Sequence, residues 1–345
     1  MKIRALVGAA VLVGAVAVTA PAPAAGAASP YVALGDSYSS GTGTRTYLND
    51  GTSCQRSVYA YPSLIASSKG YALNFRACSG ASTADVTNSQ LSALDAGTAY
   101  VSITVGGNDA GFSSVLTECA KPAWMSNCYG AIDRAQNVIN NDLPGRLTSL
   151  YSSIRSRATQ ARIVAVGYPR LFNGTDCNAG TWFSATEMSR LNTTGDLLNA
   201  KISAAASAAG FAFGDPTSAF TGHAICASTE WINGLSYPTS ESYHPNRLGH
   251  SSGYTPLVGP KLTGAQVALS PMSLQEAVSS ADRLAAQQRT HSADDRRIRP
   301  ERFVLPDLHT AAARAAAARA GVNLNDRASI DAADRRYEAA QNRGR

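Results

Sequence analysis

Five short apolar runs, separated by longer helix-like stretches, constrain the fold of this chain more than any other feature. The runs are residues 31–34, 72–75, 100–105, 162–166 and 211–213. Short, nearly continuous apolar strands are typical of a parallel sheet that is buried on both faces. Because such strands alternate with helices here, the pattern indicates an α/β fold with a five-stranded parallel sheet.

Two helical stretches are predicted to cover this sheet. Residues 131–158 carry apolar side chains at a spacing close to 3.6 residues, with Pro144 as a predicted break or kink. Residues 184–209 have a second apolar side, which includes Met188, Leu191 and Leu198. Helices on both faces of one sheet give a three-layer α/β/α sandwich.

The residues just after each strand are the first candidates for a functional site, because ligands of open α/β sheets bind beyond the carboxyl ends of the strands. Asp36 and Ser37 follow the first strand, Ser79 and Gly80 the second, and residues 106–109 the third.

Ser37 precedes Gly41 and Gly43, which predicts a tight transition from strand to helix. A serine there would be accessible, at a helix N-terminus whose N–H groups favour developing negative charge. The same position also suits a simple helix cap. The segment Gly-Asp-Ser alone therefore does not decide between a nucleophile and a cap.

The wider pattern distinguishes these two readings. Gly80 stands in Ala-Cys-Ser-Gly-Ala-Ser, Asn108 in Gly-Gly-Asn-Asp, and His244 in Ser-Tyr-His-Pro-Asn. Serine, glycine, asparagine and histidine in this order resemble the four blocks of the SGNH subgroup of GDSL esterases and lipases. The resemblance covers residues 30 to about 265 and, with its six cysteines, is similar to secreted lipases and phospholipases A1 of filamentous actinobacteria. It implies the flavodoxin-like SGNH-hydrolase form of the sandwich.

The resemblance also implies a role for each block. Ser37 would attack an ester carbonyl, and His244 would take its proton and pass it to the leaving alcohol. The oxyanion hole would consist of the backbone N–H groups of Ser37 and Gly80 and the side-chain amide of Asn108. Glycine suits the second position because a side chain would obstruct the substrate. No metal and no cofactor is expected.

The group that orients His244 departs from the family pattern. Family members commonly have an aspartate three residues before the histidine, and this chain has Glu241 there. Either Glu241 reaches the imidazole, or the backbone carbonyl of Ser242 accepts its Nδ1–H. We favour the carbonyl. Asp215, after the fifth strand, is a third candidate, although its place before a proline fits an ordinary turn.

A second serine motif competes with Ser37. Residues 249–253 fit the G-x-S-x-G pattern, with Ser251 as the nucleophile. That motif requires a strand before it and an acid and a histidine after it. The preceding residues are polar and broken by proline, and only His291 and His309 follow, both in a charged tail. We therefore assign the nucleophile to Ser37 and interpret His223 as a loop histidine.

The ends of the chain and its cysteines indicate secretion. Basic residues, an apolar run at 5–20 and small residues at 25–28 form the pattern of a signal peptide, assigned to residues 1–28. The run is too short and too rich in glycine and alanine for a transmembrane anchor. An even set of six cysteines without paired CxxC spacing predicts disulfides in an oxidising, extracellular compartment. Fifteen pairings are open, and local closure favours Cys54–Cys78, Cys119–Cys128 and Cys177–Cys226.

Charge separates the rest of the chain into two parts. Residues 29–268 form the predicted hydrolase domain, in which basic residues are scattered, so the net charge of +6 does not indicate nucleic-acid binding. Residues 269–345 form a charged, Ala/Arg-rich C-terminal extension, predicted to be partly helical or disordered. The resemblance does not reach it. Its arginines could contact an anionic lipid surface transiently, and we expect a monomer.

The resemblance implies a lipolytic carboxylic-ester hydrolase, a lipase or phospholipase A1, that acts through an acyl-enzyme on Ser37, and the leader pattern and cysteines indicate that it is secreted. A carbohydrate-ester deacetylase, an acyltransferase and a catalytically silent surface-binding protein remain as alternatives on the same scaffold. The fold alone does not separate them, and neither acyl-chain length, headgroup nor regioselectivity can be read from the sequence.

Overall fold

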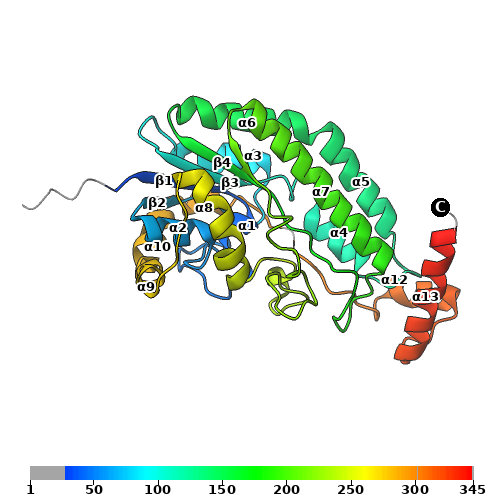
Figure 1. The fold of residues 1–345 in the computed structure, drawn as a ribbon. Helices are drawn as coiled ribbons and strands as arrows, with labels where there is room; N and C mark the ends of the chain where they lie inside the picture. Colours follow the sequence, from blue (N-terminus) through cyan, green and yellow to red (C-terminus); the bar gives the residue numbers. More distant parts are fainter. Residues whose placement is uncertain (1–27, 301, 344–345) are drawn as a thin grey trace, which may run out of the picture.

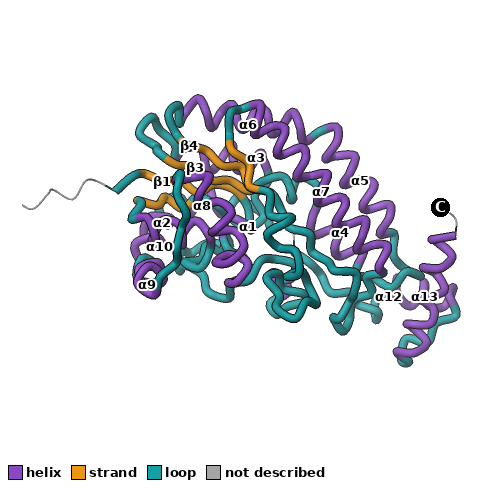
Figure 2. The backbone as a smooth tube through the Cα atoms, in the orientation of Figure 1, coloured by secondary structure: helices purple, strands orange, loops and turns teal. Residues whose placement is uncertain are grey.

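A five-stranded parallel sheet forms the centre of the protein (Figure 2). The computed structural model describes residues 28–300 and 302–343. Every strand arises from one of the predicted apolar runs: β1 (Pro30–Gly35), β2 (Ala72–Phe75), β3 (Tyr100–Thr104), β4 (Arg162–Val166) and β5 (Ala212–Gly214). Their order is β2-β1-β3-β4-β5. β2 lies on one side of β1, and β3 to β5 lie on the other. Such a topological switch point is where open α/β sheets bind ligands.

Helices cover both faces of the sheet, which gives the predicted three-layer sandwich (Figure 1). α2 (Tyr61–Lys69) and α8 (Thr255–Thr263) pack on one face. α6 (Leu143–Arg157) and α7 (Ala185–Ala208) lie on the other, with α5 (Cys128–Asn141) packed against both. The shorter helices of this domain are α1 (Ser37–Ser40), α3 (Thr83–Asp85) and α4 (Phe112–Cys119), with π-helices at Val86–Gln90 and Gly249–Tyr254 and 3-10 turns at Leu91–Ala93 and Thr239–Glu241.

The long amphipathic stretch divides as its proline predicts. α5 ends at Asn141 and α6 begins at Leu143, so that Pro144 lies in the first turn of α6. Proline is tolerated there because the first N–H groups of a helix have no intrahelical partner.

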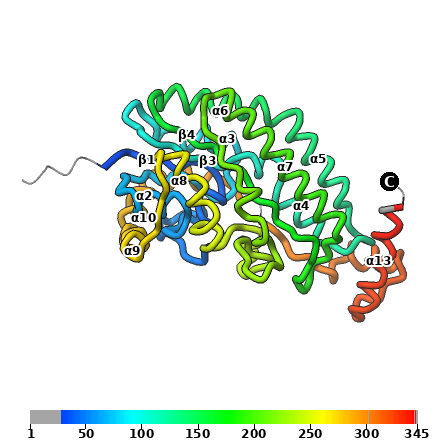
Figure 3. Tube along the Cα trace, viewed as in Figure 1, coloured from blue at the N-terminus to red at the C-terminus, as the bar shows by residue number. Residues whose placement is uncertain are grey.

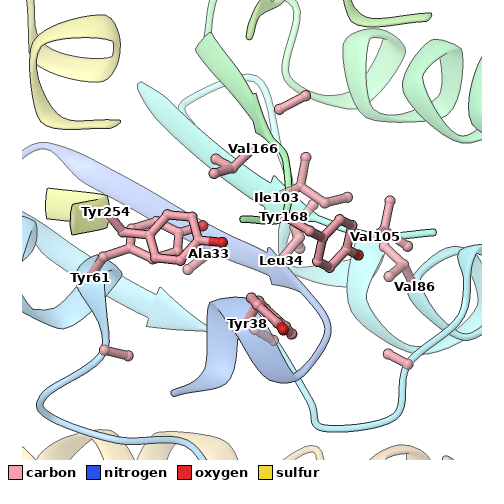
Figure 4. Packing of buried hydrophobic residues seen from close by; sticks show 14 of the residues in the cluster. Ala33, Leu34, Tyr38, Tyr61, Val86, Ile103, Val105, Val166, Tyr168 and Tyr254 are labelled. Atoms are coloured by element: carbon pink, nitrogen blue, oxygen red, sulfur yellow. The ribbon is translucent and has the colours of Figure 1, made fainter. Parts of the chain in front are cut away.

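The core lies on both sides of the strands (Figure 4). Ala33, Leu34 and Ile103 are fully buried in the sheet, and Tyr61 and Tyr254 pack against them from the α2 and α8 layer. The continuous apolar pattern of the strands is therefore explained by burial on two faces.

Three disulfides cross-link this domain, and each joins two cysteines that are consecutive in the chain: Cys54–Cys78, Cys119–Cys128 and Cys177–Cys226. This is the pairing that local closure favoured. The second bridge joins the end of α4 to the start of α5.

The C-terminal extension is packed against the domain over part of its length. Its helices are α9 (Pro271–Ser279), α10 (Ala281–Arg289), α11 (Ser292–Asp295), α12 (Ala311–Ala320) and α13 (Arg327–Arg343). Leu284, Ile298 and Phe303 belong to the main hydrophobic core. In Figure 3 the orange segment after α10 runs along the domain to α12 and α13 at the far end of the molecule. The extension therefore contains helices, the first of the two predicted alternatives, and some of its side chains are buried against the domain.

The predicted signal peptide lies outside the described residues, apart from Ala28. Among the residues that the structure does describe, no helix combines the length and the apolar character needed to cross a membrane.

Candidate active site

The four sequence blocks meet at the carboxyl edge of the sheet. Ser37, Gly80, Asn108 and His244 line one small cavity, although up to 207 residues separate them in the chain. The structure therefore brings together all four residues that the sequence pattern singled out.

Ser37 and His244 form a hydrogen-bonded pair. His244 Nε2 lies 2.9 Å from Ser37 Oγ, and its Nδ1 lies 2.8 Å from the carbonyl oxygen of Ser242. A carbonyl oxygen only accepts hydrogen bonds, so Nδ1 carries the proton and Nε2 is left to accept one from the serine hydroxyl. This is the geometry of a nucleophile beside a general base.

The surroundings of His244 keep the imidazole neutral. The side chain is buried, and this burial lowers the pKa of His244 to about 4, against the opposing effect of the Ser242 carbonyl. The rings of Tyr38 and Phe112 lie 5.3 and 5.9 Å from the imidazole, centroid to centroid. At neutral pH the ring can therefore accept a proton.

Asp36 sets the position of Ser37. Its carboxylate caps α1 by accepting the Tyr38 N–H at 3.0 Å, and it also accepts the hydroxyls of Thr104, at 2.6 Å, and Tyr168. Burial raises the pKa of Asp36 to about 6, against the effect of these hydrogen bonds. The sequence pattern assigned no role to Asp36. An aspartate directly before a helix start is nevertheless a helix-cap signal that could have identified it.

A disulfide holds the loop after β2 that contains Gly80. Cys78 is bonded to Cys54, and the Ser79 N–H donates to the Cys54 carbonyl at 2.9 Å. Gly80 has φ of +86°, in the left-handed region that glycine adopts without strain.

Asn108 is held by the same loop. Its amide Nδ2 donates to the Ala81 carbonyl at 3.0 Å. The neighbouring Asp109 accepts the N–H of Thr83 at 2.9 Å and its hydroxyl at 2.6 Å. The loops after β2 and β3 are therefore tied to each other, which fixes Asn108 relative to Gly80.

Of the three groups considered for orienting His244, the Ser242 carbonyl is the one in contact. The Glu241 carboxylate instead pairs with Arg45 at 2.7 Å and accepts the Tyr47 hydroxyl at 2.6 Å. Asp215 is exposed and accepts the N–H of Thr217 at 2.9 Å, as in an ordinary turn.

The backbone before His244 has an unusual conformation that the sequence did not reveal. Tyr243 is fully buried and has φ of +63°, which is uncommon for a residue with a large side chain. The Tyr38 hydroxyl donates to the Tyr243 carbonyl at 2.7 Å. Such strained residues persist where surrounding contacts hold them, and they cluster at active sites.

The competing serine lies elsewhere. Ser251 belongs to the π-helix Gly249–Tyr254, which no strand precedes, and does not line the cavity of His244. The adjacent His250 is buried, which lowers its pKa to about 3, and its Nδ1 accepts the Tyr61 N–H at 3.3 Å. His223 stacks on Trp231 with centroids 3.8 Å apart, as expected of a loop histidine.

Two further features bear on the chemistry. An apolar cavity of about 80 Å³ borders the site, because Phe112 and Leu116 line both spaces. Among the described residues, the grouping with metal-ligand spacing is Cys177, Cys226 and Glu230, in which the two sulfurs already form a disulfide. Metal-ligating cysteines are thiolates, so this grouping does not fit a metal site.

Comparison with known proteins gives a consistent result. Residues 33–251 match the model of the GDSL-like Lipase/Acylhydrolase family. Lipase 1 of Streptomyces coelicolor is 41% identical over 73% of this chain and 93% of its own length. A lipase of Streptomyces rimosus is 43% identical over 67% of this chain and 86% of its own length.

Two solved structures share the fold of the domain. An extracellular lipase from Streptomyces rimosus superposes with a TM-score of 0.63 at 41% identity, and phospholipase A1 from Streptomyces albidoflavus with 0.64 at 42% identity. Each match covers 68% of this chain and all of the solved chain. About a third of this chain therefore has no counterpart in either structure.

Proposed function

This chain belongs to the GDSL-like lipase/acylhydrolase family and is a lipolytic ester hydrolase, and we propose that it acts through an acyl-enzyme on Ser37. The observation that carries this proposal is the relay from Ser37 Oγ to His244 Nε2 and from His244 Nδ1 to the Ser242 carbonyl, at 2.9 and 2.8 Å.

In the first half-reaction, Ser37 Oγ attacks the ester carbonyl carbon while His244 Nε2 takes the hydroxyl proton. The imidazolium then gives this proton to the leaving alkoxide as the carbonyl–oxygen bond breaks, which releases the alcohol and leaves Ser37 acylated. In the second half, His244 takes a proton from water, which attacks the carbonyl carbon of the acyl-enzyme. The imidazolium returns this proton to Ser37 Oγ as the acyl–Oγ bond breaks, which releases the acid and restores the free serine. The Ser242 carbonyl keeps Nδ1 protonated throughout, the role that an aspartate has in a triad.

We assign the stabilisation of the tetrahedral oxyanion to three donors: the N–H groups of Ser37 and Gly80 and the side-chain amide of Asn108. An amide nitrogen has two N–H donors. One of those of Asn108 binds the Ala81 carbonyl, which orients the other without using it. We therefore expect Asn108→Ala to lower kcat by about a hundredfold or more.

The acyl chain is assigned to the apolar cavity beside the dyad. Tyr38, Phe112 and Leu116 form its wall toward the site, and Leu198 and Gly195 of α7 line it on another side. Apolar lining with few polar groups suits a hydrocarbon chain better than a sugar. This supports a lipase or phospholipase A1, the activities named for the two structural relatives, over a carbohydrate-ester deacetylase.

We also propose that the enzyme is secreted and that its leader is removed near Ala28. Support comes from the leader pattern, the three disulfides, and a relative that is described as extracellular.

The test uses the purified protein without its leader and two serine variants, Ser37→Ala and Ser251→Ala. Each is assayed with p-nitrophenyl esters from acetyl to palmitoyl, with a phosphatidylcholine dispersion and with acetylated xylan. We expect activity on long-chain esters or phospholipid that is lost in Ser37→Ala and kept in Ser251→Ala.

Activity that survives in Ser37→Ala would contradict the nucleophile assignment. Cleavage of acetylated xylan without cleavage of long-chain esters would replace the lipolytic reading by the deacetylase. Ester transfer to an added alcohol at the expense of hydrolysis would indicate an acyltransferase.

A further inference from the structure

The C-terminal extension passes over the proposed active site. Pro300, Arg302 and Phe303 line the same cavity as Ser37 and His244. We call residues 298–300 and 302–304 the strap. In Figure 3 they belong to the orange segment between α10 and α12.

The strap leaves too little space for an ester. Ser37 and His244 are 6% and 7% exposed, and the cavity between them and the strap has a volume of about 20 Å³. A single water needs roughly 10–15 Å³ of such space. An ester carbonyl with its acyl and alcohol groups cannot enter while the strap is in place.

Pro300 makes the closest approach. A Cβ atom added to Gly80 would lie 2.3 Å from Pro300 Cα and 2.6 Å from its Cβ. The proline therefore packs directly on Gly80, the residue proposed to supply an oxyanion donor. Any side chain at position 80 would collide with the strap as well as with a substrate.

The strap is anchored on both sides of this contact. Before it, Asp295 is fully buried and pairs with Arg56 at 2.7 Å and Arg76 at 2.9 Å. After Pro300, the buried ring of Phe303 meets Tyr243 edge to face at 4.8 Å, and the Val304 N–H donates to the Thr117 hydroxyl at 3.0 Å. Tyr243 directly precedes His244, so the downstream anchor rests on the active-site loop itself.

The far end of the extension is docked independently. Asp331 of α13 accepts the indole N–H of Trp182 at 3.0 Å, and Asp334 accepts the Ala123 N–H at 2.6 Å. Ile330 packs in a small cluster with Trp124 and Trp182. The strap is thus held between two attachment points on the hydrolase domain.

We propose that the strap is an autoinhibitory element, which keeps the full-length chain latent until it is displaced from Gly80 and Tyr243. This inference rests on the proposed function of Ser37.

The first experiment loosens the strap in the full-length chain. The double variant Pro300→Gly/Phe303→Ala is compared with wild type and with Val304→Ala, a neighbouring substitution of a side chain that is 60% exposed. The readouts are the rate at which a small fluorophosphonate labels Ser37 and kcat/KM for p-nitrophenyl butyrate. If the site is mostly closed, both rates scale with the open fraction, so we expect about a tenfold or greater rise in the double variant and none in the control.

Equal rates in wild type and in a folded double variant would overturn the autoinhibitory role and leave the proposed function intact. A folded double variant that is neither labelled at Ser37 nor active on any ester would instead remove the proposed function, and the strap's role with it. Circular dichroism and the melting temperature establish which variants are folded.

A second variant gives the opposite perturbation and does not depend on the first being stable. Thr117→Cys/Val304→Cys places two thiols where the Val304 N–H now meets the Thr117 hydroxyl, and a disulfide there would lock the strap. We expect the locked protein to be labelled at least about tenfold more slowly than wild type, with recovery on mild reduction. Wild type under the same reductant controls for the native disulfides. A locked protein as reactive as wild type would disprove the proposal.

Discussion

At the scale of single residues, the group that orients His244 is a backbone atom, and this has a direct test. Glu241→Gln keeps the shape of the side chain and removes its charge. Because the Ser242 carbonyl, not Glu241, meets Nδ1, we expect kcat/KM to stay within about threefold of wild type, in contrast to the losses of about a hundredfold seen when a catalytic donor is removed. The melting temperature should fall, since Glu241 is buried and paired with Arg45.

Steady-state kinetics and a thermal melt of Glu241→Gln are the measurements, with Asn108→Ala as the catalytic comparison. A loss of a hundredfold or more in Glu241→Gln would show that the carboxylate acts on the imidazole after all.

The acid limit of activity follows from the buried imidazole. His244 acts as a base only when neutral, and burial lowers its pKa from 6.5 to about 4. As the pH falls from 7 to 5 the ring stays neutral, so kcat/KM of the full-length chain should hold there and fall as the pH drops through about 4. The measurement is a pH profile with an uncharged ester.

His250→Asn is the matched control, because His250 also has a lowered pKa but is not in contact with Ser37. It should leave the acid limit unchanged. An acid limit near pH 6 would instead indicate that the loss of activity follows the protonation of Asp36, whose pKa is raised to about 6.

Which site residues could be predicted depends on how far their function is encoded in side-chain type. Ser37, Gly80, Asn108 and His244 are each proposed for a role that few residue types can fill, so spacing and order were enough to single out four residues that line one cavity. The Ser242 carbonyl was only one of three options, because every residue has a carbonyl and only the fold aims it. The left-handed backbone conformation of Tyr243 could not be predicted either, because it too is set by the fold and not by the residue type.

At the scale of elements, α7 offers a way to change acyl-chain preference. Gly195 lies inside this helix and lines the apolar cavity, and an added Cβ would meet no atom within 4 Å. Gly195→Leu should therefore be accommodated and fill part of the cavity. We expect kcat/KM for the palmitoyl ester to fall by about tenfold or more relative to the acetyl ester, since a few misplaced methylenes change binding by this much.

Gly195→Ala is the control, since it gives a similar gain in helix propensity with little added volume. It should leave the ratio of palmitoyl to acetyl activity near that of wild type. An unchanged ratio in Gly195→Leu would show that the acyl chain binds elsewhere.

The strands and long helices were predictable because each is periodic or continuous in apolar residues over its whole length. β2 and β4 have the predicted bounds. The extension was not predictable in this way. Ile298 is a single apolar residue among arginines, Phe303 opens a run of only three apolar residues, and the Asp295 partners Arg56 and Arg76 lie more than 200 residues earlier. Composition therefore left open whether the extension is helical or disordered and did not reveal the tertiary contacts that pack it against the domain.

At the scale of the whole molecule, Asp295 joins the extension to the domain. Its loss would leave the guanidinium groups of Arg56 and Arg76 buried beside each other with one charge fewer to compensate them. Removing one partner of a buried ion pair typically costs about 3–5 kcal/mol. Because this charge network is one of the two attachments of the strap, we expect Asp295→Asn to detach the strap locally before the domain unfolds.

Limited proteolysis with dilute trypsin measures this detachment, because trypsin cleaves after Arg296 and Arg297, which directly follow Asp295. Cleavage should be at least about tenfold faster in Asp295→Asn than in wild type. Asp294→Asn is the control, because that carboxylate pairs with Arg297 at the surface, where an ion pair contributes little. Equal cleavage of the two variants would show that the buried network does not anchor the extension.

An inhibitor carried on the same chain as its target has a local concentration that dilution cannot change, commonly in the millimolar range for short connections. The activity of the intact protein per molecule should therefore be the same at any protein concentration. A single cut after Arg297 would turn the same contacts into an association between two molecules. After the cut, dilution into a larger volume would lower the concentration of the inhibitory segment and so raise the fraction of open sites.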